Sequence, residues 1–154
     1  MGNGTISQKK MAREISAAFR NVGFSVYIAG KGLKKRCFDN IQTAPYFDFN
    51  QLLPQSVLYI NHGGQNSVID GLIYGVPQLI CAGKVFERRY NAGSIVKIGA
   101  GLEIPYKAFT GRNIKAAADK IISENEYREN AYDSLFKTKQ KMEGRSNRDA
   151  AAIR

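Results

Sequence analysis

Two kinds of hydrophobic pattern alternate along this chain of 154 residues. The first is helical: Met11, Ile15 and Phe19 recur at helical spacing inside 7–22, and Gly23 ends the stretch. The second is a short apolar run bounded by glycine, proline or polar residues, which is typical of a buried strand. These runs predict strands within 24–29, 40–48, 57–61, 78–82 and 101–104. The helical patterns predict further helices within 66–74, 91–97, 110–123, 127–142 and 147–153.

Strands that alternate with helices indicate βαβ units, in which neighbouring strands run parallel and helices cover both faces of the sheet. We therefore expect a single α/β domain over residues 1–154, with a Rossmann-like parallel sheet. Ligands of such sheets bind beyond the carboxyl ends of the strands. The most distinctive residues of the chain follow one of these ends, directly after the strand expected within 57–61.

The segment after this strand has the composition of an anion-binding turn. His62, the chain's one histidine, is followed by Gly63 and Gly64, which can adopt positive φ and let a ligand approach the backbone. Asn66 or Ser67 can cap the next helix, and the free N–H groups at a helix N-terminus favour negative charge. His62 could donate a hydrogen bond to the same anion. Together these residues predict a phosphate site.

A longer string around this turn matches a known signature. It reads His62-Gly63-Gly64-x-Asn66-Ser67-x-x-Asp70, then Gly75-Val76-Pro77, then Glu87-Arg88-Arg89-Tyr90-Asn91-Ala92. The string closely resembles the donor signature of UDP-glycosyltransferases of the GT-B fold, which include UDP-glucuronosyl and UDP-glucosyltransferases and the macrolide-type glycosyltransferases. The resemblance implies that the chain is the donor-binding C-terminal half of such an enzyme, lacking its first strand. It also implies that the acceptor-binding N-terminal domain is absent.

The resemblance assigns a donor site. Its residues would be Gly4, Thr5, Tyr46, His62, Gly63, Gly64, Asn66, Ser67, Asp70, Glu87 and Arg88. In the family the histidine contacts the phosphates, which aids departure of the nucleotide. Gly4 and Thr5 look like the loop at the head of the domain, and Tyr46 aligns with an aromatic that stacks on the base. Asp70 stands where the family usually has Glu, which binds the ribose; because Asp is one methylene shorter, its reach is reduced.

Two of these residues have competing interpretations. Arg88 stands where the family usually has Gln, and unlike Gln it only donates hydrogen bonds and is always charged. It is either a surface residue paired to Glu87 or a contact for a donor that bears a carboxylate. Tyr46 or Phe47 either stacks on the base or packs in the core.

The resemblance implies transfer of a hexosyl group from a nucleotide diphosphate sugar, most simply a UDP-sugar, to a hydroxyl acceptor. The family needs no metal or other cofactor, and its catalytic base lies in the N-terminal domain, so we assign no catalytic residue and expect donor binding with little or no transfer by this chain. The acceptor-binding part would be missing or supplied by another chain. Two alternatives are a nucleotide-sugar epimerase of the same fold and a non-catalytic basic binding module.

Composition adds few constraints. The net charge is +10, yet the excess of Lys and Arg lies towards both ends, and no nucleic-acid-reading motif is present. We therefore expect no nucleic-acid partner, whereas an anionic membrane surface stays open. The run Lys34-Lys35-Arg36 is interpreted as a solvated loop. Cys37 and Cys81 are too few for a disulfide framework, and no residues have metal-ligand spacing. With neither a signal peptide nor a membrane span, we expect a cytoplasmic location, with a location peripheral to the membrane as the alternative.

Overall fold

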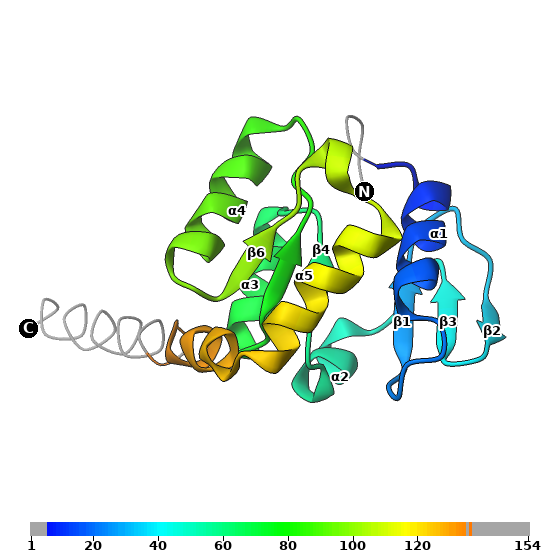
Figure 1. Cartoon of the computed structure of the whole chain (residues 1–154), viewed down its shortest axis with the longest axis horizontal. Helices are drawn as coiled ribbons and strands as arrows, with labels where there is room; N and C mark the ends of the chain where they lie inside the picture. The colour runs from blue at the N-terminus through cyan, green and yellow to red at the C-terminus, as the bar shows by residue number, and fades with distance from the viewer. Residues whose placement is uncertain (1–5, 135, 137–154) are drawn as a thin grey trace, which may run out of the picture.

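Helices and strands alternate in the computed structural model, which describes residues 6–134 and 136 (Figure 1). The elements are α1 (Gln8–Phe19), β1 (Val26–Ala29), β2 (Arg36–Phe38), β3 (Ile41–Ala44), α2 (Phe49–Leu52), β4 (Tyr59–Asn61), α3 (Gln65–Ile73), β5 (Gln78–Ile80), α4 (Phe86–Lys97), β6 (Gly101–Glu103) and α5 (Gly111–Ser123). Two short 3₁₀ helices are η1 (Leu53–Gln55) and η2 (Tyr106–Ala108). Residues 125–134 are also helical. The α/β class predicted from the sequence is confirmed.

The six strands form two three-stranded sheets, whereas the sequence predicted a single sheet. One sheet has the order β1-β3-β2, with β1 and β3 parallel and β2 antiparallel to β3. The other has the order β4-β5-β6 and is parallel throughout. The strands β1 and β4 are therefore the neighbouring ends of two separate sheets.

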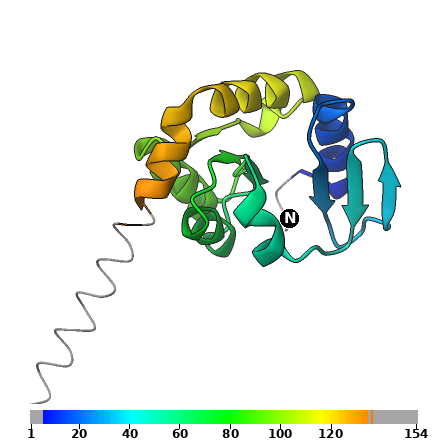
Figure 2. The same cartoon turned by 90° about the horizontal axis from the view of Figure 1, so that it is seen from below.

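The central strand of the second sheet, β5, is buried on both faces. Leu79 and Cys81 join the larger apolar cluster, to which α1 and α5 contribute. Ile80 and Ala82 join the smaller cluster, beneath α3 and α4. This alternation follows from the two-residue period of a strand. It places α1 and α5 side by side on one face, as Figures 1 and 2 show, and α3 and α4 on the other.

Side chains cap the first turns of α1 and α5. The Ser7 hydroxyl accepts a hydrogen bond from the Lys10 N–H at 3.3 Å, and the Thr110 hydroxyl accepts one from the Asn113 N–H at 3.4 Å. Satisfying these orphan donors stabilises the first turns of α1 and α5. Glu14 joins the two helices, because its carboxylate also accepts a hydrogen bond from the Gly111 N–H at 2.8 Å.

Three local predictions need correction or lie outside the described residues. Lys34-Lys35-Arg36 does not form only a loop, because Arg36 begins β2, which a turn at Asp39 with φ of 49° connects to β3. The helix expected within 91–97 begins earlier, at Phe86, so Glu87 and Arg88 lie in its first turn. The helix expected within 147–153, with Gly4 and Thr5, lies outside the described residues. Among the described helices, none is long and apolar enough to cross a membrane.

Candidate functional site

The predicted anion-binding turn joins the carboxyl end of β4 to α3. Gly63 adopts φ of 78°, as expected, whereas Gly64 has φ of −64° and is the N-cap of α3. The helix thus begins at Gln65, one residue earlier than predicted. Neither Asn66 nor Ser67 caps it, because both already lie in its first turn.

The open end of α3 presents unpaired backbone donors. The first N–H of the turn to bond within the helix is that of Val68, which donates to the Gly64 carbonyl at 3.0 Å. The N–H groups of residues 65–67 precede this bond and are left for a ligand or water. They open on a cavity of about 390 Å³ lined by His62, Gly64, Gln65, Asn66 and Ser67. We call these five residues the cradle.

Both glycines are required for space, and Gly63 also for its backbone conformation. A Cβ atom on Gly63 would lie 2.8 Å from the carbonyl oxygen of Arg88 and 3.1 Å from the side chain of Ile80. A Cβ atom on Gly64 would lie 2.6 Å from Nε2 of His62. The imidazole therefore lies directly against the backbone at the start of α3, where a larger residue would displace it.

Buried polar side chains hold the turn from below. Oδ1 of the Asn61 side chain accepts a hydrogen bond from the Gly63 N–H at 2.8 Å, and the side-chain amide of Asn61 donates to Oε1 of Gln78 at 2.8 Å. The Gln78 amide in turn donates to the Val68 carbonyl at 3.0 Å. Both side chains are almost fully buried, so every one of these bonds matters for stability. They tie β4, β5 and α3 together beneath the cradle.

A second tie comes from α4. The Asn91 side chain donates a hydrogen bond to the Gly63 carbonyl at 2.9 Å. Sequence reasoning matched Asn91 only as part of a signature, and it gave no role to Asn61 or Gln78. For Asn61 and Gln78 the sequence did contain a signal, because each is a polar residue in an apolar strand run. Burying a polar side chain costs free energy unless it is hydrogen-bonded.

An imidazole and a guanidinium interact electrostatically at the turn. His62 is half-buried, and this burial is the main reason that its pKa is lowered, with the nearby charge of Arg88 adding to the effect. The imidazole is therefore mostly neutral near pH 7 and can donate a single N–H to a ligand. Nη1 of Arg88 is buried and has no hydrogen-bond partner within the described residues. Arg88 lies beside the turn, since its charge acts on His62, but it is not among the residues that line the cradle.

The ion pair considered for Arg88 is not formed. The ion pairs among the described residues join Arg13 to Glu14 and Lys115 to Asp119, and Glu87 is exposed in the first turn of α4. An acidic residue in a first turn is favourable there because of the helix dipole, whether or not it binds a ligand. This removes the surface-pair interpretation for Arg88.

On α3, Ser67 and Asp70 lie near Tyr59 of β4. Burial raises the pKa of the Tyr59 phenol, the Ser67 hydroxyl lowers it through a hydrogen bond, and the Asp70 carboxylate raises it. Ser67 thus contacts both the cradle and β4. Asp70 follows one turn later along the same helix, as expected from its spacing.

The comparisons with known proteins agree with this geometry. A protein-family profile described as "Erythromycin biosynthesis protein CIII-like, C-terminal domain" matches residues 29–139. The chain belongs to this family. The resemblance recognised in the sequence is confirmed, and the match covers most of the described residues.

Curated relatives of this EryCIII-like domain are transferases by name. It is 29% identical over 60% of its length to an aclacinomycin-T 2-deoxy-L-fucose transferase of Streptomyces galilaeus, covering 21% of that protein. It is 27% identical over 71% of its length to the NDP-glycosyltransferase YjiC of Bacillus subtilis, covering 29%. A human UDP-glucuronosyltransferase 2A3 is 27% identical over 80% of this chain and 24% of its own length. The chain therefore spans less than a third of each of these relatives.

Solved structures agree with the fold assignment. The calicheamicin glycosyltransferase CalG4 superposes with a TM-score of 0.76 over 88% of this chain and 36% of its own, at 18% identity. The glycosyltransferase VinC, solved with dTDP, gives 0.72 over 81% of this chain and 32% of its own, at 21% identity. At these identities the likeness concerns the fold, which is that of the C-terminal half of a GT-B enzyme.

The predicted base-stacking aromatics of the EryCIII-like domain differ in environment. Tyr46 is 73% exposed, so the core-packing interpretation does not apply to it. Phe47 packs edge-on against Tyr27, with ring centroids 5.4 Å apart. Of the two, Tyr46 is the more exposed side chain, and Phe47 is half-buried.

Proposed function

We propose that this EryCIII-like domain binds the nucleotide diphosphate sugar of a GT-B glycosyltransferase, most simply a UDP-sugar, with the diphosphate in the cradle. The single observation that supports this most strongly is the open N-terminus of α3, which His62 and the unpaired Arg88 both adjoin. Backbone donors and a helix dipole converge there, with the Arg88 cation beside the turn, an arrangement that favours anion binding. The residues are pre-positioned by the buried bonds of Asn61 and Gln78.

This arrangement fits the departure of a nucleotide better than other chemistry. In transfer, the bond between the sugar C1 and the diphosphate oxygen breaks, and the diphosphate leaves with the electron pair. Fixed donors at the cradle would stabilise the negative charge that develops on it. The acceptor hydroxyl and the base that takes its proton would come from outside this domain. We therefore propose donor binding, with little or no transfer by the chain alone.

The two alternatives receive less support. The named relatives are transferases, which favours transfer over epimerisation. A non-catalytic basic module would not need a preformed cradle, since its binding would follow the overall charge. Donor binding at the cradle predicts dependence on His62, whereas charge-driven binding predicts dependence on salt and on the number of lysines.

The test is a thermal-shift titration of the chain with UDP and with UMP. UDP at 100 times its Kd should stabilise the fold by about 2.7 kcal/mol. His62→Ala should weaken UDP about tenfold to a hundredfold, because a charge-assisted hydrogen bond contributes about 1.5–3 kcal/mol. UMP, which lacks the second phosphate, should be affected less by the same substitution.

Arg89→Ala is the matched control, because Arg89 is an exposed cation one residue beyond Arg88. It should leave UDP affinity within about twofold, as surface substitutions usually do. Unfolding of the ligand-free His62→Ala variant would show that His62 is structural. Equal weakening of UDP and UMP would show that His62 does not contact the diphosphate. Either result would contradict the proposed site.

A further inference from the structure

The β1-β3-β2 sheet ends in an open edge at β2. Among the described residues β2 pairs only with β3, and Figures 1 and 2 both show it as the outermost strand of its sheet. An edge strand presents backbone N–H and C=O groups that no neighbouring strand satisfies. We call residues 34–38 the β2 edge; they comprise β2 and the two residues before it.

The hydrogen bonds between β1 and β3 show which side of β3 faces β2. The Val26 N–H donates to the Asn40 carbonyl at 2.8 Å, and the Gly30 N–H donates to the Ala44 carbonyl at 3.0 Å. Successive residues of a strand direct their backbone groups to opposite sides. The even-numbered residues of β3 therefore face β1, and the odd-numbered residues face β2.

The register then identifies the free backbone groups of β2. Phe38 lies opposite Ile41, and Arg36 lies opposite Thr43. Because these two residues of β3 face β2, the backbone groups of Phe38 and Arg36 are the ones directed at β3. The N–H and C=O of Cys37, between them, are directed away from the sheet. The β2 edge thus offers one donor and one acceptor to a further strand.

Positive charge gathers along this edge. Lysine and arginine side chains are exposed on the edge itself, in the loop that leads to it and on the adjacent first turn of α1: Lys9, Lys31, Lys34, Lys35 and Arg36. The turn of α1 is held beside the loop, because the Gln8 side chain accepts a hydrogen bond from the Gly32 N–H at 2.6 Å. We call these five residues the basic rim.

The basic rim has no compensating negative charge within the described residues. The ion pairs there join Arg13 to Glu14 and Lys115 to Asp119, so neither includes a residue of the rim. Residues 28–38 contain no Asp or Glu, and Asp39 follows β2 in the turn at its far end. A cluster of like charges of this kind attracts anionic partners.

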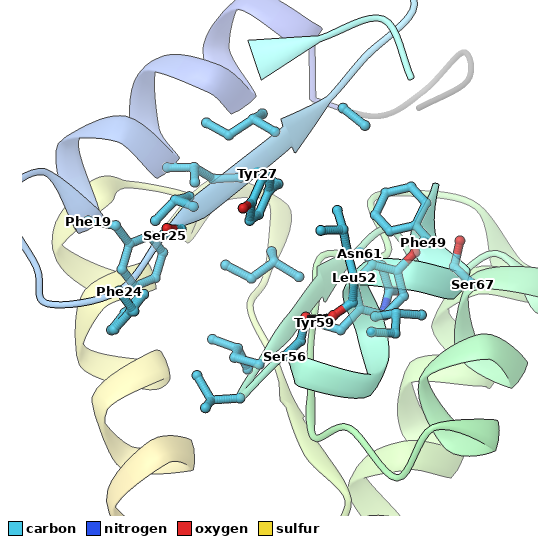
Figure 3. A pocket seen from close by; sticks show the side chains of 18 of the residues that line it. Phe19, Phe24, Ser25, Tyr27, Phe49, Leu52, Ser56, Tyr59, Asn61 and Ser67 are labelled. Atoms are coloured by element: carbon cyan, nitrogen blue, oxygen red, sulfur yellow. Dashed lines mark hydrogen bonds between the residues drawn. The ribbon is translucent and has the colours of Figure 1, made fainter. Parts of the chain in front are cut away.

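The opposite edge of the same sheet differs. β1 borders a cavity of about 470 Å³, where Tyr27 lies across from Tyr59 and Asn61 (Figure 3). Among the described residues, no lysine, arginine, aspartate or glutamate lines this cavity. The positive charge of the sheet is therefore concentrated at its open edge, where a partner can reach it.

An open edge with cations fits an extended acidic peptide. A peptide strand supplies its own N–H and C=O groups, as strand addition to a sheet edge requires, whereas a lipid headgroup or a nucleic-acid phosphate does not. Opposite charges on neighbouring strands are favourable, and like charges are unfavourable. A second copy of this chain would bring the same cations to the edge, so it is a poor partner.

We propose that the β2 edge binds an extended acidic segment of a partner protein by strand addition. The segment pairs its backbone with the N–H and C=O of Cys37, and its carboxylates lie beside the basic rim. Lysines on an edge strand also discourage pairing between identical chains. The same cations therefore reject one class of strand and select another. No step of this inference depends on nucleotide binding at the cradle.

The test is an NMR titration of the whole chain with the peptide Glu-Val-Glu-Val-Glu at low ionic strength. The matched control is the same peptide with every backbone nitrogen methylated, which keeps the charges and side chains but has no N–H donors. The unmodified peptide should bind at least about tenfold more tightly than the methylated one, because only it can form a backbone ladder. Lys-Val-Lys-Val-Lys should bind at least about tenfold more weakly than the acidic peptide.

A pair of double variants tests the position of the site. Lys34→Glu/Lys35→Glu should weaken the acidic peptide at least about tenfold, since it places like charges beside the carboxylates. Lys97→Glu/Lys120→Glu changes the net charge equally, at exposed positions on α4 and α5, and should change the affinity by less than about twofold. The hydrogen bond from Thr43 to Lys34 involves the Lys34 carbonyl, so the first variant retains it.

Hydrogen exchange locates the contact on the backbone. The Cys37 amide should exchange at least about tenfold more slowly with the acidic peptide bound. The Val26 amide, already bonded to the Asn40 carbonyl, serves as the internal reference and should not change.

Four outcomes would overturn the proposal. Equal binding of the methylated and unmodified peptides would show attraction by charge alone. Equal weakening by the two double variants would show that the rim is not the site. Unchanged exchange at Cys37 would show that no strand is added there. Binding of phosphatidylglycerol vesicles that depends on Lys34 and Lys35, without binding of the peptide, would show that the rim recognises a lipid surface instead.

Discussion

The two sheets use buried polar side chains differently. In the β4-β5-β6 sheet, Asn61 and Gln78 are 3% and 0% exposed and bond to each other as well as to the backbone on either side. In the β1-β3-β2 sheet, the buried polar side chain is Thr43, which makes a single bond to the Lys34 carbonyl at 2.8 Å. A buried amide costs more than it returns unless all its groups are paired. The linked bonds of Asn61 and Gln78 therefore fix the geometry of the turn at Gly63, and the β1-β3-β2 sheet has no equivalent among its described residues.

The largest effect should follow from Gln78→Met. This change keeps the length of the side chain but leaves the Asn61 amide without its acceptor in a dry interior and removes the bond to the Val68 carbonyl. The orphaned amide costs about 1–3 kcal/mol and the second lost bond about 1 kcal/mol, so the free energy of unfolding should fall by roughly 2–4 kcal/mol. Urea denaturation followed by circular dichroism measures it.

Thr43→Val is the matched control in the other sheet. It removes one hydrogen bond whose acceptor, the Lys34 carbonyl, belongs to an exposed residue that water can reach. The loss should be about 1 kcal/mol. A loss at Thr43 equal to that at Gln78 would contradict the difference between the two sheets.

Gly63→Ala should have the next largest effect. Its φ of 78° disfavours a side chain by about 1–2 kcal/mol, and the added Cβ would meet the Arg88 carbonyl at 2.8 Å. We expect a stability loss of about 2–3 kcal/mol together with weaker UDP binding. Gly23→Ala, where no atom lies within 4 Å of the new Cβ, should be neutral or slightly stabilising in the same melting experiment.

Arg88→Gln should change ligand preference with little effect on stability. The unpaired guanidinium can form a charge-assisted pair with a carboxylate on the sugar, which is worth about 1.5–3 kcal/mol. Wild type should therefore prefer UDP-glucuronate over UDP-glucose by about tenfold or more, and Arg88→Gln should lose that preference. Arg89→Gln should keep it. Titration calorimetry with both sugars supplies the ratio, and a wild-type ratio near one would show that Arg88 does not face the sugar.

The smallest effect concerns pH. The pKa of His62 is lowered in the folded chain, so the unfolded chain takes up the proton first on acidification. Without ligand, the contribution of His62 to the free energy of unfolding is therefore fully present above pH 6.5, the ordinary pKa of histidine. This contribution is lost as the pH falls from there through the lowered pKa of the folded chain. UDP binding should favour the imidazolium, so UDP affinity should rise by less than about tenfold between pH 8 and pH 6.5. The same titration on His62→Ala should be flatter, and identical slopes would contradict the phosphate contact.

What could be predicted from the sequence depends on the distance between interacting residues along the chain. The glycine turn after β4, the positive φ of Gly63 and the helix within 110–123 are each defined within a few neighbouring residues and were predicted, whereas the predicted cap of α3 was wrong. The bond from Asn91 to Gly63 joins residues 28 apart, and local patterns carry no signal for such a contact. β2 was missed for a related reason, because its three residues contain no apolar run and form a strand only by pairing with β3.

The division of the strands into two sheets could not be predicted from local sequence patterns for the same reason. Each expected strand run was found, but a period of two says which face of a strand is buried and nothing about which strand lies beside it. That information is present only in the pairing of β1 with β3 and of β4 with β5.

The position of Cys81 at the end of β5 has a practical chemical consequence. Burial raises the pKa of its thiol to about 11, so almost none of the reactive thiolate exists near neutral pH while the chain is folded. The chain's other cysteine, Cys37, is exposed on β2. A maleimide should therefore label Cys37 at once and Cys81 only when the central strand opens. The rate of Cys81 labelling therefore reports how often the domain opens. Slower labelling in the presence of UDP would measure how much the ligand stabilises the folded state, without any spectroscopic signal from the nucleotide.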